Sequence, residues 1–424
     1  MATLVRNLSQ LATPVGAGGI RGRAMAELRV IADAAVVMGE GRFLFAGTER
    51  DLPADLAAGI GEEIDGRRGT AIPGLVDAHT HLPFAGLRES EFNRRLHGES
   101  YEQIAATGGG IASTVRSTRA ATREELTALV IDRTRVMARY GTTTAEAKSG
   151  YGLTLEDEIK QLRAIRDAQP DAAVRLVPTC LAAHEFPPGI DREDPAAREG
   201  WLREITERIL PAVAEEKLAG YCDVFVERGV FTPREGERIL LRGRELGLTP
   251  RLHADELSDL GGAALAARLG AASADHLMQI SDAGIRALAE SGTVANLLPG
   301  TSFFLMSDRY APARELIDAG AIVALSTDCN PGSSMTESMQ MVMQLATLRM
   351  KMTVEESLTA ATLNAAASLG LAGEIGSIEE GKRADLVLID APNYLHLVYH
   401  FGVNLVTRVW MDGARVDLQE CHAP

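Results

Sequence analysis

Eight short apolar runs lie between residues 70 and 370, and stretches of helical periodicity separate them. The runs are Ala71–His79, Thr142–Ala147, Val174–Ala183, Cys222–Glu227, Thr249–His253, Ala272–His276, Val294–Leu298 and Ile322–Asp328. The helical stretches include Arg123–Ala138, Leu155–Ala168, Ala196–Ala214, Pro233–Leu246 and Pro312–Ala319. Strands that alternate with helices predict parallel strands joined by crossover helices. Eight such repeats predict an α/β fold, a closed (β/α)8 TIM-type barrel, rather than an open sheet.

The two ends of the chain carry a different pattern, of short alternating runs joined by glycine-containing turns. The runs are Ala35–Met38, Phe43–Ala46, Ala384–Ile389 and Thr407–Met411. Asp412-Gly413 follows the last of them and is typical of a hairpin turn. Neither end has enough strands to close its own core. We therefore predict a small β-sandwich domain assembled from residues 1–66 and 376–424, with the barrel, residues 67–375, inserted between them.

The composition limits the partners of the chain. Its 424 residues include 43 Lys and Arg and 58 Asp and Glu, so the formal net charge is −15. Such a surface repels a phosphate backbone, which argues against nucleic acid as a partner. No uncharged apolar run approaches the ~18 residues of a membrane-spanning helix. The few cysteines form no C-x-x-C pair and predict reduced thiols in the cytoplasm. They are Cys180, Cys222, Cys329 and Cys421.

Residues that can bind a metal stand at the ends of the first, fifth and eighth apolar runs. The first run leads into His79-Thr80-His81, and because strand side chains alternate, the two imidazoles point the same way. His253 ends the fifth run and Asp328 the eighth. An isolated H-x-H pair is more often structural, but this set at the carboxyl ends of barrel strands predicts a metal site. Its donors suit one zinc or iron ion and leave a position open for water.

Two more ionisable residues stand at or just after the ends of apolar runs. His276 ends the sixth run, and Glu256 lies three residues after His253. A bound metal lowers the pKa of its water and so generates hydroxide. We expect Glu256 to shuttle a proton to the leaving nitrogen, and His276 to stabilise the developing oxyanion or position the water. Asp328 is a second candidate acceptor for the water proton. The alternative for Glu256 is a charge in the first turn of a helix.

This set resembles the mononuclear branch of the amidohydrolase superfamily, and Gly376–Leu386 resembles that superfamily's return to its small domain. The resemblance to the imidazolonepropionase family is closer and covers nearly the whole chain. Its motifs are Asp77–His81, Phe84–Gly86, Gly108–Ile111, Lys148–Leu153, Ala183-His184, His253–Leu257, Ser273–Leu277, Leu298–Thr301 and Thr327–Ser333. The sequence departs from the family's pattern at Pro83 and Leu87, which lie in a segment that varies. Neither departure affects a candidate ligand.

The resemblance implies hydrolysis of the cyclic amide of 4-imidazolone-5-propanoate to N-formimidoyl-L-glutamate in histidine degradation. It implies a homodimer with one Zn²⁺ or Fe³⁺ per subunit, and the sequence leaves the choice of metal open. The implied substrate contacts are Arg88, Tyr151, His184, Glu256, Asn330, Gly332 and Ser333. The Arg88 guanidinium can bind a carboxylate tail bidentately. The alternatives are a surface ion pair of Arg88 with Glu89 or Glu91, and a purely packing role for Tyr151.

Three other functions compete with this one. A mononuclear aminohydrolase, resembling cytosine or guanine deaminase, would use the same metal set on an exocyclic amine. A two-metal hydrolase would need a bridging Lys on the fourth strand, but Cys222–Arg228 has none and Lys148 is on the second. A scaffold without enzymatic activity would be expected to have lost its ligands, whereas here the full set is present.

Overall fold

The structure is a computed structural model that describes residues 2–99, 103 and 108–418. Eight parallel strands form one sheet, in chain order, so the predicted α/β barrel is confirmed. They are β6 (Leu75–Asp77), β7 (Thr142–Lys148), β8 (Arg175–Ala183), β9 (Tyr221–Val226), β10 (Thr249–Ala254), β11 (Ser273–His276), β12 (Val294–Leu297) and β13 (Val323–Leu325). The bounds of six strands agree with the predicted runs to within a residue. β6 is shorter because Thr70–Pro73 pairs elsewhere, and β13 ends three residues before its predicted run does.

The barrel closes between its first and eighth strands, just beyond the ends of β6 and β13. The Asp328 amide donates to the His79 carbonyl at 3.0 Å, and the His81 amide donates to the Cys329 carbonyl at 3.0 Å. Thr80 and Cys329 form a parallel bridge between these two hydrogen bonds. The closure therefore sets the H-x-H segment directly beside Asp328 at the same rim of the barrel.

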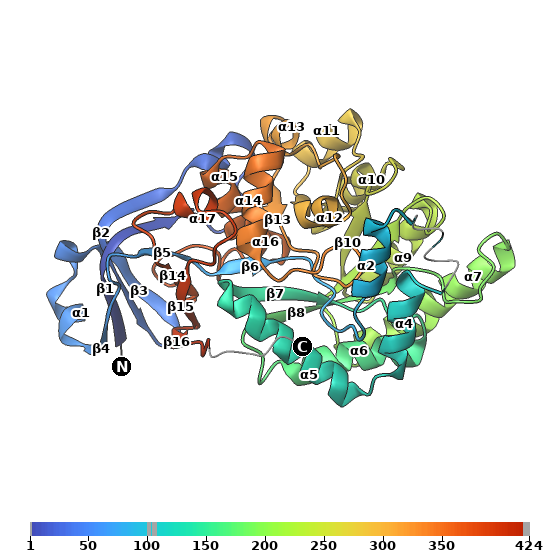
Figure 1. The fold of residues 1–424 in the computed structure, drawn as a ribbon, viewed down its shortest axis with the longest axis horizontal. Coiled ribbons are helices and arrows are strands. Elements are labelled where there is room, and N and C mark those ends of the chain that lie inside the picture. The colour runs from blue at the N-terminus through green and yellow to red at the C-terminus, as the bar shows by residue number, and fades with distance from the viewer. Residues whose placement is uncertain (1, 100–102, 104–107, 419–424) are drawn as a thin grey trace.

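Helices surround the barrel (Figure 1). Those before β11 are α2 (Glu89–Leu96), α4 (Ile111–Ala120), α5 (Arg123–Arg139), α6 (Leu155–Ala168), α7 (Pro195–Arg203), α8 (Leu210–Glu215), α9 (Pro233–Glu245) and α10 (Gly262–Leu269). Those after it are α11 (Asp282–Glu290), α12 (Pro299–Phe304), α13 (Ala313–Asp318), α14 (Met339–Met350), α15 (Val354–Ala360) and α16 (Leu363–Ser368).

The predicted helix starts at residues 123, 155 and 233 are confirmed, because a threonine caps each one. Thr122, Thr154 and Thr232 each accept the amide three residues ahead through the side-chain oxygen. The predicted helix Ala196–Ala214 is continuous but not regular. It consists of α7, a π-helical turn at Glu204–Ile209, and α8.

Strands from both ends of the chain form the second sheet, and they lie side by side in Figure 1. They are β1 (Ala2–Thr13), β2 (Arg29–Gly39), β3 (Arg42–Thr48), β4 (Ile60–Asp65), β5 (Thr70–Pro73), β14 (Leu386–Ile389), β15 (Val406–Met411) and β16 (Ala414–Arg415). β14 pairs with β5, and β5 with β1, so the two ends share one sheet. The sheet branches at β1, whose first half pairs with β4.

The predicted hairpin turn at Asp412-Gly413 is confirmed. Both residues have positive φ, 50° and 72°, and they join the antiparallel strands β15 and β16. Short elements complete this region: α1 (Ala54–Ala58), α17 (His396–Tyr399) and 3₁₀ turns at Gly22–Ala26 and Glu49–Asp51. The predicted boundaries of the small domain stay a prediction; Cys421 and the last six residues of its C-terminal segment lie outside the described residues.

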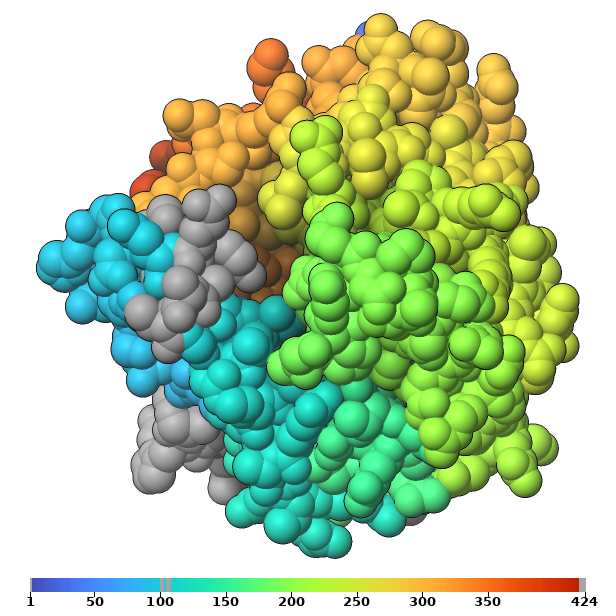
Figure 2. Space-filling model, turned by 90° about the vertical axis from the view of Figure 1, so that its right-hand side faces the viewer, coloured from blue at the N-terminus to red at the C-terminus, as the bar shows by residue number. Residues whose placement is uncertain are grey.

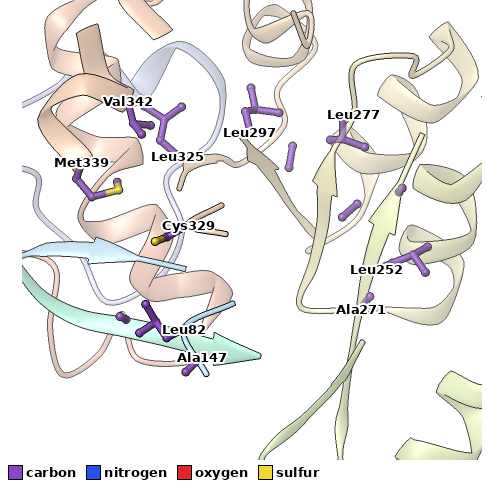
Figure 3. Packing of buried hydrophobic residues seen from close by; sticks show 14 of the residues in the cluster. Leu82, Ala147, Leu252, Ala271, Leu277, Leu297, Leu325, Cys329, Met339 and Val342 are labelled. Atoms are coloured by element: carbon purple, nitrogen blue, oxygen red, sulfur yellow. The ribbon is translucent and has the colours of Figure 1, made fainter. Parts of the chain in front are cut away.

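Apolar side chains fill the space between the barrel strands and the surrounding helices. Leu252, Leu277, Leu297 and Leu325 come from or directly follow four consecutive strands and are fully buried (Figure 3). Cys329 lies in the same apolar cluster. Asp328 faces the barrel mouth while its neighbour packs into the core, so this core position helps to fix the direction of the Asp328 side chain.

Gly74 joins the two sheets, between β5 and β6, and its amide donates to the Asp385 carbonyl at 2.9 Å. A Cβ added there would stand 2.9 Å from Cβ of the buried, β-branched Thr143. We expect Gly74→Ala to lower the free energy of unfolding by about 1–3 kcal/mol, as overpacking does. Gly200→Ala is the matched control: nothing lies within 4 Å of that Cβ, and in helix α7 it should stabilise by about 0.5–1 kcal/mol. Denaturant unfolding measures both. Equal effects would mean that the Thr143 contact relaxes freely.

Candidate active site

Four histidines and one aspartate meet at the carboxyl ends of the barrel strands. Asp328 Oδ1 lies 3.5 Å from His79 Nε2 and 3.4 Å from His81 Nε2. The His79 ring also faces those of His253 and His276, at centroid distances of 4.5 and 5.3 Å. The structure therefore brings together all four residues predicted as metal ligands, with His276 beside them.

Two groups of three donors lie close enough to share an ion, among the residues that the structure describes. One group is His79, His81 and Asp328, and the other is His79, His253 and His276. Within each group the donor atoms lie within 4.8 Å of one another. Because His79 belongs to both, the two groups describe one centre. The predicted ligand set spans both groups, and His276 is the additional donor.

The imidazoles of this centre are buried, and those of His79, His81 and His276 are neutral, whereas the Asp223 carboxylate raises the pKa of His253. Within the described part of the chain, His79 Nε2, His81 Nδ1 and both ring nitrogens of His276 have no hydrogen-bond partner. Burial lowers the pKa of His79 and His81 well below the usual value, and that of His276 to about 3. A neutral imidazole offers the lone pair that a metal ion requires. These orphaned nitrogens, together with the Asp328 carboxylate, fit a bound metal ion.

Two aspartates that the sequence analysis gave no role stand behind the histidines. Asp275 Oδ2 is hydrogen-bonded to His79 Nδ1 at 2.9 Å, and Asp223 Oδ2 lies 3.0 Å from His253 Nδ1. Carboxylates behind ligand imidazoles fix their tautomer and ring orientation. A signal for Asp223 exists in the sequence. It is a charged residue inside a predicted buried strand, where an unpaired charge is strongly unfavourable.

Glu256 stands at the mouth of β10, beside His276 rather than among the clustered donors. Its Oε2 lies 3.7 Å from His276 Nε2. Burial raises the pKa of Glu256 to about 8, and the nearby Asp328 carboxylate adds to the rise. The Glu227 carboxylate accepts the Leu257 amide at 2.8 Å and so holds the loop that carries Glu256. The side chain therefore carries a proton at neutral pH in a fixed place.

A cavity of about 510 Å³ opens above these residues. The view of the face on which α2, α4 and α7 lie shows a depression near its centre (Figure 2). Every residue predicted to contact substrate lines the cavity: Arg88, Tyr151, His184, Glu256, Asn330, Gly332 and Ser333. Apolar residues that the sequence analysis missed complete the wall: Phe92, Ile111, Phe225, Leu257 and Leu305. Ile111 and Leu257 end two of the motifs quoted above, whereas Phe92, Phe225 and Leu305 belong to none, so only the fold places those three here.

Arg88 lies in the cavity wall at the start of α2, with a side chain only 13% exposed. Its guanidinium pairs with Glu91 at 2.9 Å, so the ion pair considered as an alternative exists, but within the cavity. A Cβ on Gly332 would collide with this guanidinium, so the glycine permits their close approach. Arg88 therefore has both a partner that orients it and access to a ligand.

The loop after β13 is held by its own side chains. Asn330 Oδ1 accepts the amides of Gly332 and Ser333 at 2.8 and 2.9 Å, and its amide nitrogen donates to the Asp328 carbonyl at 2.7 Å. The Thr301 hydroxyl, which the sequence analysis missed, donates to Asp328 Oδ2 at 2.7 Å. Asp328 Oδ1 is therefore directed at the histidines while Oδ2 is already engaged.

Tyr151 and His184 form another part of the cavity wall. Both rings stack or tilt against His81, at centroid distances of 5.7 and 5.0 Å. His184 Nδ1 lies 3.1 Å from the Gly150 carbonyl, which favours the tautomer that leaves Nε2 as an acceptor. Burial lowers the pKa of His184 well below the usual value. The imidazole is therefore a neutral hydrogen-bonding group.

Comparison with known proteins agrees with this geometry. The family model described as "Amidohydrolase family" matches residues 249–416. Imidazolonepropionase from Porphyromonas gingivalis is 47% identical over 418 residues, which cover 98% of this chain and 97% of the relative. Imidazolonepropionase from Symbiobacterium thermophilum is 48% identical over 408 residues, covering 96% and 95%.

Solved structures share the fold at low identity. A triazine hydrolase variant superimposes with a TM-score of 0.75 at 16% identity, covering 98% of this chain and 94% of that one. An adenosine deaminase from Xanthomonas campestris with bound zinc gives 0.68 at 21% identity, covering 97% and 92%. The barrel and its strand-end donors place this protein in the amidohydrolase superfamily, whose members bind a metal ion. Within that superfamily, the chain belongs to the imidazolonepropionase family.

No helix in the described ranges is long and apolar enough to cross a membrane.

The metal content of two variants tests which of these residues are ligands. If His79, His81, His253 and Asp328 hold one ion, His81→Ala should lose most of the bound metal, because it removes a ligand. His276→Ala should retain about one metal per chain. Elemental analysis of the purified, folded variants measures this directly. Metal loss in His276→Ala would assign His276 to the ligand set, and two tightly bound metals per active wild-type chain would contradict a mononuclear centre.

Proposed function

We propose that this protein hydrolyses the cyclic amide of 4-imidazolone-5-propanoate to N-formimidoyl-L-glutamate, a step of histidine degradation. The observation that carries the proposal is the composition of one cavity. Its base holds the metal-type donors, and its wall holds a buried guanidinium, Arg88, within the same space. A ring amide with a carboxylate tail needs both features. Membership of the imidazolonepropionase family supports the same substrate.

The metal ligands are proposed to be His79, His81, His253 and Asp328, which would hold one Zn²⁺ or Fe³⁺ per subunit. When bound, such an ion supplies a water of lowered pKa, a nucleophile at neutral pH. The protein contributes the fixed donors: the neutral imidazoles of His79 and His81 keep their lone pairs, and Thr301 engages Asp328 Oδ2 so that Oδ1 faces the centre.

Glu256 is proposed to carry the proton. Ring opening of an amide requires protonation of the leaving nitrogen, because an amide anion is a poor leaving group. A carboxyl with a pKa of about 8 holds a proton at neutral pH and can give it up in a buried site. Asp328 is the weaker candidate, since its second oxygen already accepts the Thr301 hydroxyl at 2.7 Å. Glu256 therefore serves as the catalytic acid, with Asp328 as ligand.

His276 is proposed to act on the carbonyl oxygen. Its ring is buried beside Glu256, and in the described residues neither nitrogen has a hydrogen-bond partner. An N–H group aimed at the developing oxyanion stabilises the transition state more than the ground state. A neutral imidazole can supply that donor without adding a charge. His276 thus stabilises the oxyanion, and Glu256 supplies the proton next to it.

The rest of the cavity is proposed to bind the substrate. Arg88 would hold the propionate carboxylate through a charge-assisted, bidentate contact. Tyr151 and His184 would face the imidazolone ring from the wall against His81. Asn330, Gly332 and Ser333 would shape the loop beneath the tail, where Asn330 already orders the two amides that follow it.

The broader setting of the enzyme is proposed from the sequence and the family. It acts on a small molecule as a cytoplasmic homodimer, with neither nucleic acid nor a membrane as partner. A mononuclear deaminase is the rival function, since deaminases share the fold. Turnover of imidazolonepropanoate, measured against cytosine and guanine with the same preparation, separates the two. Turnover of the nucleobases alone would overturn the proposal.

Glu256→Gln should lower kcat by about 10²–10⁴, the usual contribution of general acid–base catalysis, because the amide cannot transfer the proton. The variant should fold normally and keep its metal. Asp259→Asn is the matched control, since this carboxylate lies in the same loop but is exposed and does not line the cavity. Steady-state kinetics and metal analysis measure both. Loss of metal would make Glu256 a ligand, and near-full activity would move the proton transfer to Asp328 or His276.

Arg88→Ala should reduce kcat/KM by about 10–150-fold, because a charge-assisted contact contributes roughly 1.5–3 kcal/mol. Most of the loss should appear as a higher KM, with any fall in kcat reporting binding energy used in the transition state. Arg94→Ala removes a guanidinium from the same helix, one that pairs with Glu99 at 2.6 Å and does not line the cavity. It should leave both constants unchanged. Equal kinetics for the two variants would refute the role of Arg88.

A further inference from the structure

Five fully buried charged residues fill the interior of the barrel behind the histidine centre. Glu146 and Lys148 come from β7, Asp223 from β9, Arg251 from β10 and Asp275 from β11. Each side chain has 0% exposure. Buried ions of this kind are costly to desolvate, and replacing them by apolar residues is often neutral or stabilising. Stability alone therefore does not explain why the barrel contains them.

Lys148 is the centre of this cluster. Its ammonium lies 2.7 Å from Glu146 Oε1, 2.7 Å from Asp223 Oδ2 and 3.9 Å from Asp275 Oδ2. The last two oxygens are the same atoms that face the histidines. Asp223 Oδ2 lies 3.0 Å from His253 Nδ1, and Asp275 Oδ2 lies 2.9 Å from His79 Nδ1. One ammonium thus reaches both carboxylates that stand behind the centre.

The remaining members hold this arrangement in place. The Thr179 hydroxyl donates to Glu146 Oε1 at 2.5 Å, on the oxygen that pairs with Lys148. Arg251 lies 3.6 Å from Asp275 Oδ2, and its guanidinium donates to the carbonyl of Ala78, the residue before His79, at 2.8 Å. Strands β7, β9, β10 and β11 are therefore joined through charged groups at the level just below the ligands.

A carboxylate orients an imidazole only if the carboxylate itself cannot rotate. Asp223 and Asp275 are both acceptors, so a donor must hold each oxygen against the ring nitrogen. An ammonium has three N–H donors on a compact group, which suits a position between several carboxylates. Lys148 is therefore placed to act on two ligands at once through carboxylates on different strands. It donates to Asp223 at 2.7 Å and attracts Asp275 across 3.9 Å.

We propose that Lys148 is a positioning residue for the metal centre, which fixes the rings of His253 and His79 by holding Asp223 and Asp275. The inference rests on the proposed metal ligation by those histidines. Lys148 contacts neither substrate nor metal in this scheme. The Lys148 ammonium is already engaged by carboxylates, so this lysine is unsuited to bridge two metals. The positioning role gives it a different function.

The test compares Lys148→Met with Lys382→Met. Lys382 is also buried, and its ammonium donates to the Ala372 carbonyl at 2.6 Å and the Ser377 hydroxyl at 2.7 Å, away from the histidine centre. Both variants lose a buried ammonium, so both should lose stability. The metal dissociation constant is measured on the full-length protein by chelator competition. The visible absorption spectrum of the cobalt-substituted protein then reports the ligand geometry.

Lys148→Met should weaken metal affinity by about 10–100-fold, the usual effect of removing an outer-layer partner. Its cobalt bands should shift, and kcat should fall while KM stays close to that of the wild type, because the cavity wall is untouched. Lys382→Met should keep the affinity and the spectrum of the wild type. If Lys148→Met does not fold, Lys148→Gln, which fills the position with a neutral donor, takes its place with the same expected result.

An unchanged metal affinity and cobalt spectrum in the folded Lys148 variant would overturn the inference, and so would equal losses in Lys382→Met. These outcomes are distinct from failure of the proposed function. A wild-type protein that binds no metal tightly would refute the metal centre itself. If the wild-type protein and the Lys148 variant bind metal equally well, only the positioning role is refuted.

Discussion

Closure of the barrel is the constraint on which the site depends. Two backbone hydrogen bonds join the ends of β6 and β13, from the Asp328 amide to the His79 carbonyl and from the His81 amide to the Cys329 carbonyl. Through them, residues about 250 positions apart become neighbours on adjacent strand ends. The distance from Asp328 Oδ1 to each of the two histidines follows from this pairing. Loss of closure would separate the carboxylate from the imidazoles before any side chain changed.

Electrostatics at the barrel mouth follow from burial. Desolvation keeps the imidazoles of His79 and His81 neutral and the Glu256 carboxyl protonated, so lone pairs and a proton stand beside the Asp328 carboxylate and the Arg88 guanidinium in the cavity. The charged groups lie one level deeper, where Lys148 and Arg251 offset most of the charge of the carboxylates. Metal ligation and the orientation of the ligands are thus carried out by residues at different depths in the barrel. The ligand imidazoles face the cavity mouth, and the ions that stand behind them are enclosed by the strands.

The sequence predicted the elements of the barrel well, because the periodicity of strands and the threonine caps of helices are local. It also placed the candidate ligands on the right strand ends, since His253 lies near the end of β10 and the others follow β6 or β13 within a few residues. The deeper charges were missed because Glu146 and Asp223 sit inside apolar runs, and which strands stand opposite each other is decided only by closure. Phe92 lines the cavity from helix α2 and belongs to no motif. Thr301 ends a quoted motif, but its contact with Asp328 exists only because the fold brings helix α12 beside that carboxylate. The sharing of β5 with the small sheet likewise depends on non-local pairing.

The conformation of the strand ends explains how so many functional groups converge. Asp255, His276 and Asp328 end or follow three barrel strands and have φ of 49°, 79° and 56°, a left-handed region that non-glycine residues seldom adopt. Such residues cost roughly 1–3 kcal/mol each and persist only where their surroundings determine them. Here the determinants are visible. Asp255 accepts the Gly262 and Ala263 amides at 2.9 Å at the start of α10, and Asp328 is held by its amide and by Thr301. At His276 and Asp328 the left-handed residue itself lines the cavity, and at Asp255 the next residue, Glu256, does.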